Sequence, residues 1–342
     1  MTDPLIARAE EAARRLAPLA GRTERQGVDR PALDALARAG LHGVLGPEAV
    51  TGRAPSAPVY RRVAEVLSGA DGTTWFVWFQ HHPVVKMLAA SANQELAGRW
   101  LPGLCAGTTQ AGVAFSHLRR EQVAMPATRL DGGWRLSGVA PWCTGWGLLD
   151  LVLVGATTAD DEVLFALVPL AEGDAMAHGP PLHLSAMGGT RTFPLHLDGY
   201  VVADDDVVLV APRAQWGVAD AANGANVQPS TFGIALAALD ELAALDPPAA
   251  AALSSRVEGV RERAYELIDL VPAAEAIDER LRLRAEALAL GVTATAALVT
   301  AVGGRAVTGE HPAQRWAREA TFHLVFAQTA DVRAATLAHL GA

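Results

Sequence analysis

Cysteine is nearly absent from this sequence of 342 residues, which contains only Cys105 and Cys143. Two cysteines are too few for a disulfide framework, and such low usage is typical of a protein in a reducing compartment. Their positions also provide no spacing of a metal site. The sequence therefore predicts no metal centre.

Long apolar runs and an export signal are missing as well. No apolar run reaches the roughly 18 residues that are needed to span a bilayer. The first residues, MTDPLIARAEEAARR, are charged from the start and lack the apolar stretch of a secretory signal. We therefore expect no membrane segment and a cytoplasmic location.

Positive charge is in short supply: 28 Lys and Arg residues stand against 37 Asp and Glu residues, which gives a formal net charge of -9. Because neutralising phosphates requires a basic face, this balance argues against nucleic acid as a partner. Hydrophobic residues make up 51% of the chain, too many for a disordered protein. The length predicts two or three packed units with a large interior.

The hydrophobic pattern divides the chain into three regions. Residues 1–107 carry apolar positions at three- and four-residue spacing, which predicts an N-terminal helical domain. Residues 108–212 alternate or form short apolar runs between Gly, Asp and Pro, which predicts a middle antiparallel β-barrel or sandwich domain. Residues 213–342 return to helical spacing and predict a C-terminal four-helix bundle. The expected fold class is α+β.

Local signals mark some helix ends in the first region. The sequences Asp3-Pro4 and Asp29-Arg30-Pro31 predict helix starts, because proline is tolerated in the first turn of a helix. Gly40 and Gly69 predict helix ends.

Four segments stand out along the chain: ALARAGLHGVLGPEAVTG, EVLSGADGTTWFVWFQHH, GGWRLSGVAPWCTGWGLLDLVLVGA and RWAREATFHLVFAQTADVR. In this order they resemble four parts of the acyl-CoA dehydrogenase superfamily. These parts are an early helix–turn segment, the helix beneath the active site, a flavin-contacting strand–turn–strand and the terminal helix that closes over the substrate. The resemblance covers nearly the whole chain and implies the three-domain fold of that family.

The resemblance also implies residues that would hold FAD. Trp142 would lie beside the flavin ring, and Thr144 near its N5 and O4 edge. Ser116, in AGVAFSHLRR, takes the place of a further flavin-contacting hydroxyl. A flavin ring needs apolar walls and a few fixed hydrogen bonds, which these side chains can provide. Gly303 and Gly304 remain from the stretch that binds the adenosine half from a neighbouring subunit. The rest of that stretch has changed, so FMN is an alternative cofactor.

The sequence departs from the family where acyl thioesters are dehydrogenated. The usual Tyr-Glu-Gly-Thr, whose Glu removes the substrate α-proton, is replaced by residues 326–329, Phe-Ala-Gln-Thr. Ala327 cannot accept a proton, and a general base typically contributes about 10²–10⁴-fold to the rate. Glu241 and Glu310 remain alternatives for a displaced base. The loop HLRREQV after Ser116 also lacks the family's acidic, Pro and Gly-Ser-Asp residues that touch the thioester.

Flavin-dependent monooxygenases of the same fold also lack the dehydrogenase glutamate, and their pockets often use a histidine near the flavin. The candidates for this catalytic role are His82, His117 and His323. His81 precedes His82, and adjacent helical residues point about 100° apart, so at most one of the two is expected to face a cavity. Each histidine could equally be a hydrogen-bonded structural residue.

Two arginines on the segment that resembles the closing helix, Arg315 and Arg318, lie three residues apart and share a helical face. They could contact a phosphate or a facing carboxylate, and a structural ion pair is the favoured interpretation for Arg318.

Three hypotheses for the function follow. The first is an atypical, monooxygenase-like flavin-dependent oxidoreductase that acts on a small molecule and receives electrons from a separate flavin reductase or uses another electron acceptor. The second is an acyl-CoA dehydrogenase with a displaced base and an acyl-thioester substrate. The third keeps the fold without flavin, as a non-redox enzyme or a binding protein. The resemblance implies a homodimer or homotetramer.

Overall fold

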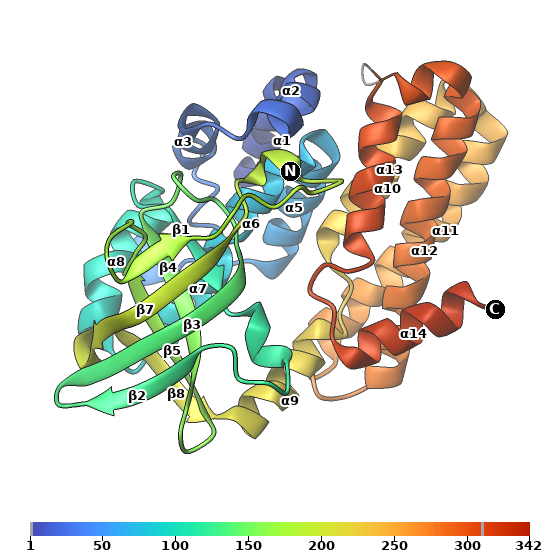
Figure 1. Cartoon of the computed structure of the whole chain (residues 1–342). Coiled ribbons are helices and arrows are strands. Elements are labelled where there is room, and N and C mark those ends of the chain that lie inside the picture. The colour runs from blue at the N-terminus through green and yellow to red at the C-terminus, as the bar shows by residue number, and fades with distance from the viewer. Residues whose placement is uncertain (1–2, 309–310) are drawn as a thin grey trace.

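The N-terminal part of the protein is helical. A computed structural model describes residues 3–308 and 311–342 (Figure 1). The helices of this part are α1 (Pro4–Leu16), η1 (Ala17–Leu19), α2 (Ala20–Gln26), α3 (Arg30–Arg38), α4 (Glu48–Thr51), α5 (Ala57–Ala70), α6 (Gly72–Phe79), α7 (His81–Ala89) and α8 (Gln94–Ala106). The predicted starts of α1 and α3 are confirmed, because Asp3 and Asp29 each accept a 2.9 Å hydrogen bond from the first turn.

The two glycines predicted to end helices differ. Gly40 follows α3 with φ 75°, as expected of a residue beyond a helix end. The prediction for Gly69 is wrong by position, because this residue lies inside α5, one residue before its end. A Cβ at Gly69 would lie 2.7 Å from the carbonyl oxygen of Gly233 on helix α10 (Pro229–Ala243). This glycine allows two helices to approach closely.

Residues 111–212 form one sheet. Its strands are β1 (Ala111–Ala114), β2 (Pro126–Leu130), β3 (Gly133–Cys143), β4 (Leu151–Thr158), β5 (Glu162–Pro169), β6 (Met176–His178), β7 (Phe193–Ala203) and β8 (Val207–Pro212), with turns η2 (Ser116–Arg119), η3 (Gly188–Thr190) and η4 (Asp204–Asp206). The strand order is β6-β7-β3-β2-β4-β5-β8, with β1 beside β4. Most neighbours are antiparallel as predicted, but β1 and β2 pair parallel to β4. The chain between β1 and β4 is long enough for such a crossover, so the sheet is mixed.

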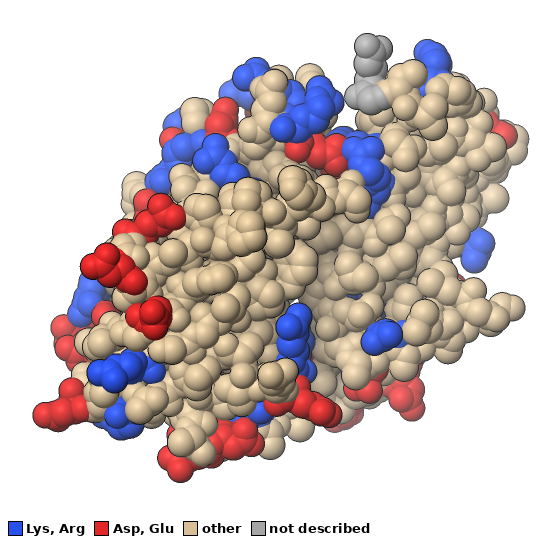
Figure 2. All heavy atoms as spheres, in the orientation of Figure 1, with Lys and Arg blue, Asp and Glu red and all other residues tan. Residues whose placement is uncertain are grey.

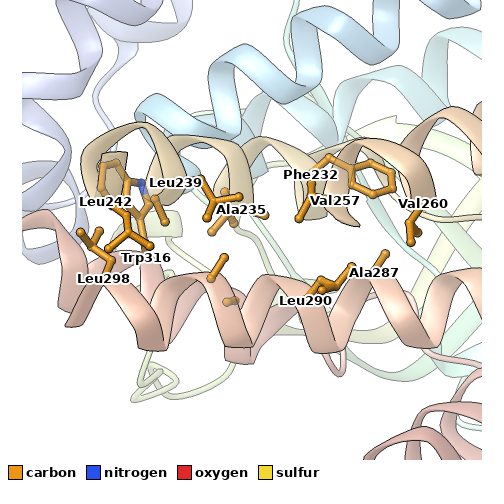
Figure 3. Packing of buried hydrophobic residues seen from close by; sticks show 14 of the residues in the cluster. Phe232, Ala235, Leu239, Leu242, Val257, Val260, Ala287, Leu290, Leu298 and Trp316 are labelled. Carbon is orange, nitrogen blue, oxygen red and sulfur yellow. The ribbon is translucent and has the colours of Figure 1, made fainter. Parts of the chain in front are cut away.

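The C-terminal part is a helical bundle. It contains α9 (Arg213–Gly224), α10, α11 (Pro247–Leu270), α12 (Ile277–Val302), η5 (Gly303–Val307), α13 (Pro312–His323) and α14 (Ala330–Leu340). Helices α10 to α13 share one apolar core, as predicted for a four-helix bundle. Figure 3 shows Phe232 and Leu239 of α10, Val257 of α11, Leu290 of α12 and Trp316 of α13 pointing toward this core.

Helix α12 is more apolar than the sequence pattern led us to expect. Together with η5, the segment Ile277–Val307 is long and apolar enough to cross a membrane, and 44% of its most apolar window is buried inside the structure. Leu283, Leu290 and Leu298 pack in the bundle core. This burial accounts for the apolar character of α12 as the central helix of a bundle, which makes it weak evidence for a membrane span.

Candidate functional site

The residues predicted to hold a flavin ring come from the sheet and the turn beside it. Ser116 begins η2 directly after β1, and η2 packs against β3, the strand that carries Trp142. Figure 1 shows η2 between the sheet and the helical bundle. Trp142 is 46% exposed despite its size, and Ser116 is half-buried. The accessible indole of Trp142 is a flat apolar surface that a planar ligand could cover.

Thr144 follows β3 and is buried at the end of a chain of hydroxyl groups. Its hydroxyl lies 2.9 Å from the Thr192 hydroxyl, which lies 2.8 Å from the Thr190 hydroxyl. Thr190 donates to the carbonyl oxygen of Met187 at 2.7 Å. A carbonyl can only accept and each hydroxyl has one proton, so all three bonds form together in one direction: Thr144 donates to Thr192, and Thr192 donates to Thr190. Thr144 keeps both lone pairs of its hydroxyl as acceptors.

His323 is held at the end of α13 in one protonation state. Its Nδ1 lies 2.8 Å from the carbonyl oxygen of Glu319, and its Nε2 lies 2.8 Å from the Ser230 hydroxyl. Burial lowers the pKa of His323 to about 4, so the ring is neutral, with its proton on Nδ1. Nε2 therefore accepts from Ser230. The ring stacks on Trp75 at a centroid distance of 5.6 Å and lies beside Phe326.

The other predicted histidines lie in the protein core. His82 is 1% exposed, packs edge-on against Trp78 and Tyr60, and has no hydrogen-bond partner for either ring nitrogen among the described residues. His117 is buried and donates from Nε2 to the carbonyl oxygen of Gly155 at 2.9 Å. Burial lowers the pKa of both side chains. Neither ring is accessible to solvent, and the same holds for His323, which is 2% exposed.

His81, the neighbour of His82, satisfies both ring nitrogens with the backbone. Nε2 bonds the Leu104 carbonyl at 3.0 Å, and Nδ1 accepts from the Ala111 N–H at 3.2 Å. This histidine therefore joins α7 to α8 and to β1.

Ala327, which the resemblance places where the family has its base, lies in the loop between α13 and α14. Its φ of 49° lies in the left-handed region, which costs an alanine about 1 kcal/mol or more. The buried guanidinium of Arg284 bonds the carbonyl oxygens of Phe326, Ala327 and Gly224, the Phe326 bond being 2.8 Å. Arg284 has no carboxylate partner among the described residues, and burial lowers its pKa to about 10. The bonds from Arg284 thus hold the backbone of the loop in place.

A cavity of about 290 Å³ lies next to this loop. Arg119 and Arg120 line it from η2 and the residue after it, Arg213 and Trp216 line it from α9, and Thr329 lines it at the start of α14. Figure 2 shows basic side chains near the lower end of the hollow between the sheet and the bundle. Arg119 forms a bidentate pair with Asp220 at 2.6 and 2.8 Å, and Arg213 pairs with Asp161 at 3.5 Å. Glu121 and Asp331 also line the cavity, and Arg120 is the arginine of this wall that forms no ion pair within the described residues. Arg120 could therefore bind an anionic ligand group.

Aromatic side chains pack against the same loop through Phe326. Phe76 and Phe79 of α6 contact Phe326, both at 5.3 Å between ring centroids, and Phe322 contacts Phe76 at 5.0 Å. All four are half-buried. The residues beside His323 and Ala327 are therefore apolar and aromatic.

The structure separates several other predicted residues from this place. Gly303 and Gly304 are exposed in η5, with no atom within 4 Å of a Cβ built on them, and η5 follows α12 at the top of the bundle in Figure 1, whereas α9 lies at the bottom. Within one chain they are therefore not near the cavity that α9 lines. Glu241 is exposed near the end of α10. Glu310 lies outside the described residues.

Three carboxylates that the sequence did not single out, Glu65, Asp71 and Glu319, are buried. Glu319 of α13 is 0% exposed and lies 2.9 and 3.0 Å from Nη1 of Arg315. Its carboxyl group packs directly on Gly72, where a Cβ would lie 2.7 Å away. Burial raises the pKa of Glu319 to about 7 in spite of Arg315. Because it is enclosed, Glu319 anchors α13 to α6 and does not face a substrate.

Both arginines predicted on this helix form ion pairs within the chain. Arg315 pairs with Glu319, and Arg318 pairs with Glu24 of α2. The structural interpretation of Arg318 is confirmed.

Comparisons of sequence agree with the motifs. Residues 7–108 match the family model of the acyl-CoA dehydrogenase N-terminal domain. The chain is similar to benzylmalonyl-CoA dehydrogenase of Aromatoleum aromaticum, with 23% identity over 347 residues that cover 93% of this chain and 91% of that protein.

Comparisons of structure extend the similarity to the whole fold. Butyryl-CoA dehydrogenase from Megasphaera elsdenii superimposes with a TM-score of 0.82 at 16% identity, over 100% of this chain and 99% of that one. Dibenzothiophene monooxygenase from Paenibacillus sp. A11-2 superimposes with a TM-score of 0.79 at 20% identity, over 97% and 95%. The predicted fold is confirmed, and it is shared by a dehydrogenase and a monooxygenase.

Proposed function

We propose that this chain, which belongs to the acyl-CoA dehydrogenase superfamily, is a flavin-dependent oxidoreductase of the monooxygenase type. One observation carries the choice of reaction: the loop that would supply the dehydrogenase base supplies Ala327, held by Arg284. The carboxylate on α13, Glu319, is enclosed and paired. Removal of an α-proton from an acyl thioester therefore lacks the base that the resemblance expects in this loop.

The residues present fit a flavin. Trp142 offers a flat apolar surface, Ser116 and Thr144 offer hydroxyl groups, and Arg120 on the cavity wall offers a cation for a phosphate. The cavity volume accommodates the phosphate of FMN or part of the FAD diphosphate, so both cofactors remain open. When bound, the flavin supplies the electron transfer that the side chains of this protein cannot perform.

We assign the surrounding residues the following roles. Neutral His323 positions the Ser230 hydroxyl beside the Ala327 loop, with its Nδ1–H on the Glu319 carbonyl and its Nε2 accepting from Ser230. Phe76, Phe322 and Phe326 exclude water from that side and offer aromatic contacts to an apolar substrate. We leave His82 and His117 in structural roles.

The proposed monooxygenase reaction implies partners, and the location is a separate proposal. A monooxygenase of this kind needs a supply of reducing equivalents, for which we propose a separate flavin reductase, and its substrate is a small molecule. Gly303 and Gly304, exposed far from the site of their own chain, would reach a flavin only in a second copy, which favours a homo-oligomer. We place the protein in the cytoplasm.

The experiment is reconstitution followed by anaerobic reduction. Flavin-free protein is incubated with FAD and with FMN, and its visible spectrum is recorded after removal of free flavin. We expect a bound flavin that butyryl-CoA does not bleach and that a flavin reductase with NADH reduces. Bleaching by butyryl-CoA would establish a dehydrogenase with another base. Absence of bound flavin in both cases would overturn the proposal and favour the non-redox alternative.

A further inference from the structure

The hydroxyl chain at the end of β3 decides what Thr144 can offer a ligand. Thr190 must donate to the Met187 carbonyl, because that oxygen has no proton to give. This fixes the proton of Thr192 toward Thr190 and the proton of Thr144 toward Thr192. With its proton engaged, Thr144 can meet a ligand only as a hydrogen-bond acceptor.

The backbone around this chain is held from two sides. Met187 and Arg191 both have left-handed φ angles, 59° and 51°, which are uncommon for residues other than glycine and persist where neighbouring structure imposes them. The carbonyl oxygen of Gly189 accepts from the Val28 N–H at 2.9 Å. The N–H of Gly145, directly after Thr144, bonds the carbonyls of Thr190 and Arg191 at 3.0 and 3.2 Å. These backbone bonds keep the three hydroxyl groups within hydrogen-bond distance of one another.

Reversing the direction of the chain is unfavourable. If Thr144 turned its proton toward a ligand, Thr192 could still donate to only one neighbour, and the bond between Thr144 and Thr192 would require Thr192 as its donor. Thr192 would then no longer donate to Thr190. Either the bond between Thr190 and Thr192 is lost, or Thr190 turns its proton to Thr192 and the bond to the Met187 carbonyl is lost. All three threonines are 7% exposed or less, so water does not readily replace the lost bond.

We propose that Thr190 and Thr192 are positioning residues that hold Thr144 as an acceptor, so that the site prefers reduced flavin to oxidised flavin. This inference rests on the proposed function, since it takes Thr144 to lie at the N5 edge of the ring. Reduced flavin carries a hydrogen on N5 and can donate to Thr144. Oxidised flavin has a bare N5, so two acceptors would face each other. The device suits a protein that receives its flavin already reduced.

The expected preference is about tenfold, because a missing hydrogen bond between buried polar groups costs about 1–3 kcal/mol and each 1.4 kcal/mol is a factor of ten. By the thermodynamic cycle, tighter binding of the reduced form raises the midpoint potential of the bound flavin. A tenfold preference corresponds to about 30 mV for a two-electron couple.

The test measures affinity and requires no turnover. Flavin-free protein is titrated anaerobically with oxidised FMN and, separately, with dithionite-reduced FMN, and both titrations are repeated with FAD. We expect the reduced form of the cofactor that binds to have a dissociation constant about tenfold below that of the oxidised form. Equal constants, or tighter binding of the oxidised form, would overturn the inference and leave the proposed function standing. Absence of binding in either redox state would instead remove the proposed function.

Substitutions locate the effect in the chain. Thr192→Val keeps the side-chain shape but removes the middle hydroxyl, so Thr144 becomes free to donate to a bare nitrogen. We expect oxidised flavin to bind more tightly and the affinity ratio to fall toward one. Thr192→Ser restores the hydroxyl and should restore the ratio.

The matched control is Thr295→Val on α12, a buried threonine whose hydroxyl bonds helix carbonyls far from β3. It should leave the ratio at its wild-type value even if it lowers stability. A Thr192→Val protein that binds flavin with the wild-type ratio contradicts the role of the hydroxyl chain. Should this variant fail to fold, the wild-type ratio and the Thr192→Ser protein still decide the matter.

Discussion

The helical bundle meets the rest of the chain in two places that are built in opposite ways. At the upper contact, α10 and α13 press on α5 and α6 through glycines: Gly69 faces Gly233, and Gly72 faces the carboxyl group of Glu319. At the lower contact, α9, the start of α14 and η2 surround a cavity of about 290 Å³ lined by arginines and carboxylates. The first contact has no space to spare, whereas the second has space and an arginine, Arg120, without an ion pair in the described part of the chain.

The difference separates anchoring from binding. Trp316 donates from Nε1 to the Gly69 carbonyl at 2.9 Å, and Arg315 pairs with Glu319, so the polar groups of the upper contact satisfy one another. Arg120 of the lower contact forms no ion pair within the described residues, and its cavity remains open to a ligand. We infer that the upper contact fixes the bundle so that the lower one can admit an anion without moving the domains.

The largest expected effect concerns the upper contact. In Gly233→Ala, the new methyl group would collide with the carbonyl oxygen of Glu65 and the hydroxyl of Ser68. Because backbone cannot yield as a flexible side chain does, we expect a loss of about 3 kcal/mol or more in the free energy of unfolding. Urea denaturation followed by circular dichroism measures it.

The control for this substitution is Gly259→Ala on α11. This glycine is exposed, and no atom lies within 4 Å of the position that the new methyl group would take. The alanine should stabilise the protein by up to about 1 kcal/mol, since glycine is a poor helix former. Similar effects at both positions would show that close helix contact does not distinguish the upper region.

Much of this fold could be predicted from the sequence because its signals are local. The change from helical spacing to alternation and back follows the three parts of the structure, and Asp3 and Asp29 begin helices through their own side chains. The role of Gly69 could not be predicted in this way, because its partner Gly233 lies far away in sequence. The parallel pairing of β1 and β2 with β4 also depends on the sheet as a whole.

The candidate site could be predicted only in part. The resemblance pointed to Trp142 and Ser116, yet it could not distinguish His323, beside the Ala327 loop, from His82, which packs against Trp78. Which face of a helix meets a cavity is decided by tertiary packing. Two signals were present and were missed: the alternation of Thr190 and Thr192, which share a face, and a charge at Arg284 within an apolar helix.

A smaller effect is expected at the upper contact, in the pH dependence of the free energy of unfolding. Burial raises the pKa of Glu319 to about 7, above the usual value of 4.5, while Arg315 opposes the shift and Asp71 and Glu24 support it. The folded state therefore holds a proton that the unfolded state has lost, and this contribution to stability is lost as pH rises from about 4.5 to 7. Glutamine resembles the protonated form and does not titrate.

Relative to wild type, Glu319→Gln should therefore gain stability between pH 5 and pH 8, by about 1–2 kcal/mol. Urea denaturation of both proteins at several pH values measures the difference. If the wild type instead became the more stable protein as pH rises, attraction to Arg315 would outweigh the cost of burying the charge. The control is a parallel series with Glu286→Gln, which removes the half-buried partner of Arg282 on α12 and should show no such gain.

The smallest expected effect belongs to the lower contact, where Arg120→Gln removes one cation from the cavity wall. An exposed charge contributes about 1 kcal/mol or less, so the affinity for FMN should fall about three- to fivefold. Riboflavin has the same ring without a phosphate, and its affinity should not change. Arg256→Gln on α11 removes an exposed arginine elsewhere and should affect neither ligand. A loss that is equal for FMN and riboflavin would place Arg120 at the ring. A loss specific to FMN, and smaller at high salt, would place the phosphate in the open contact, because ions screen an exposed arginine far more than the enclosed Arg315.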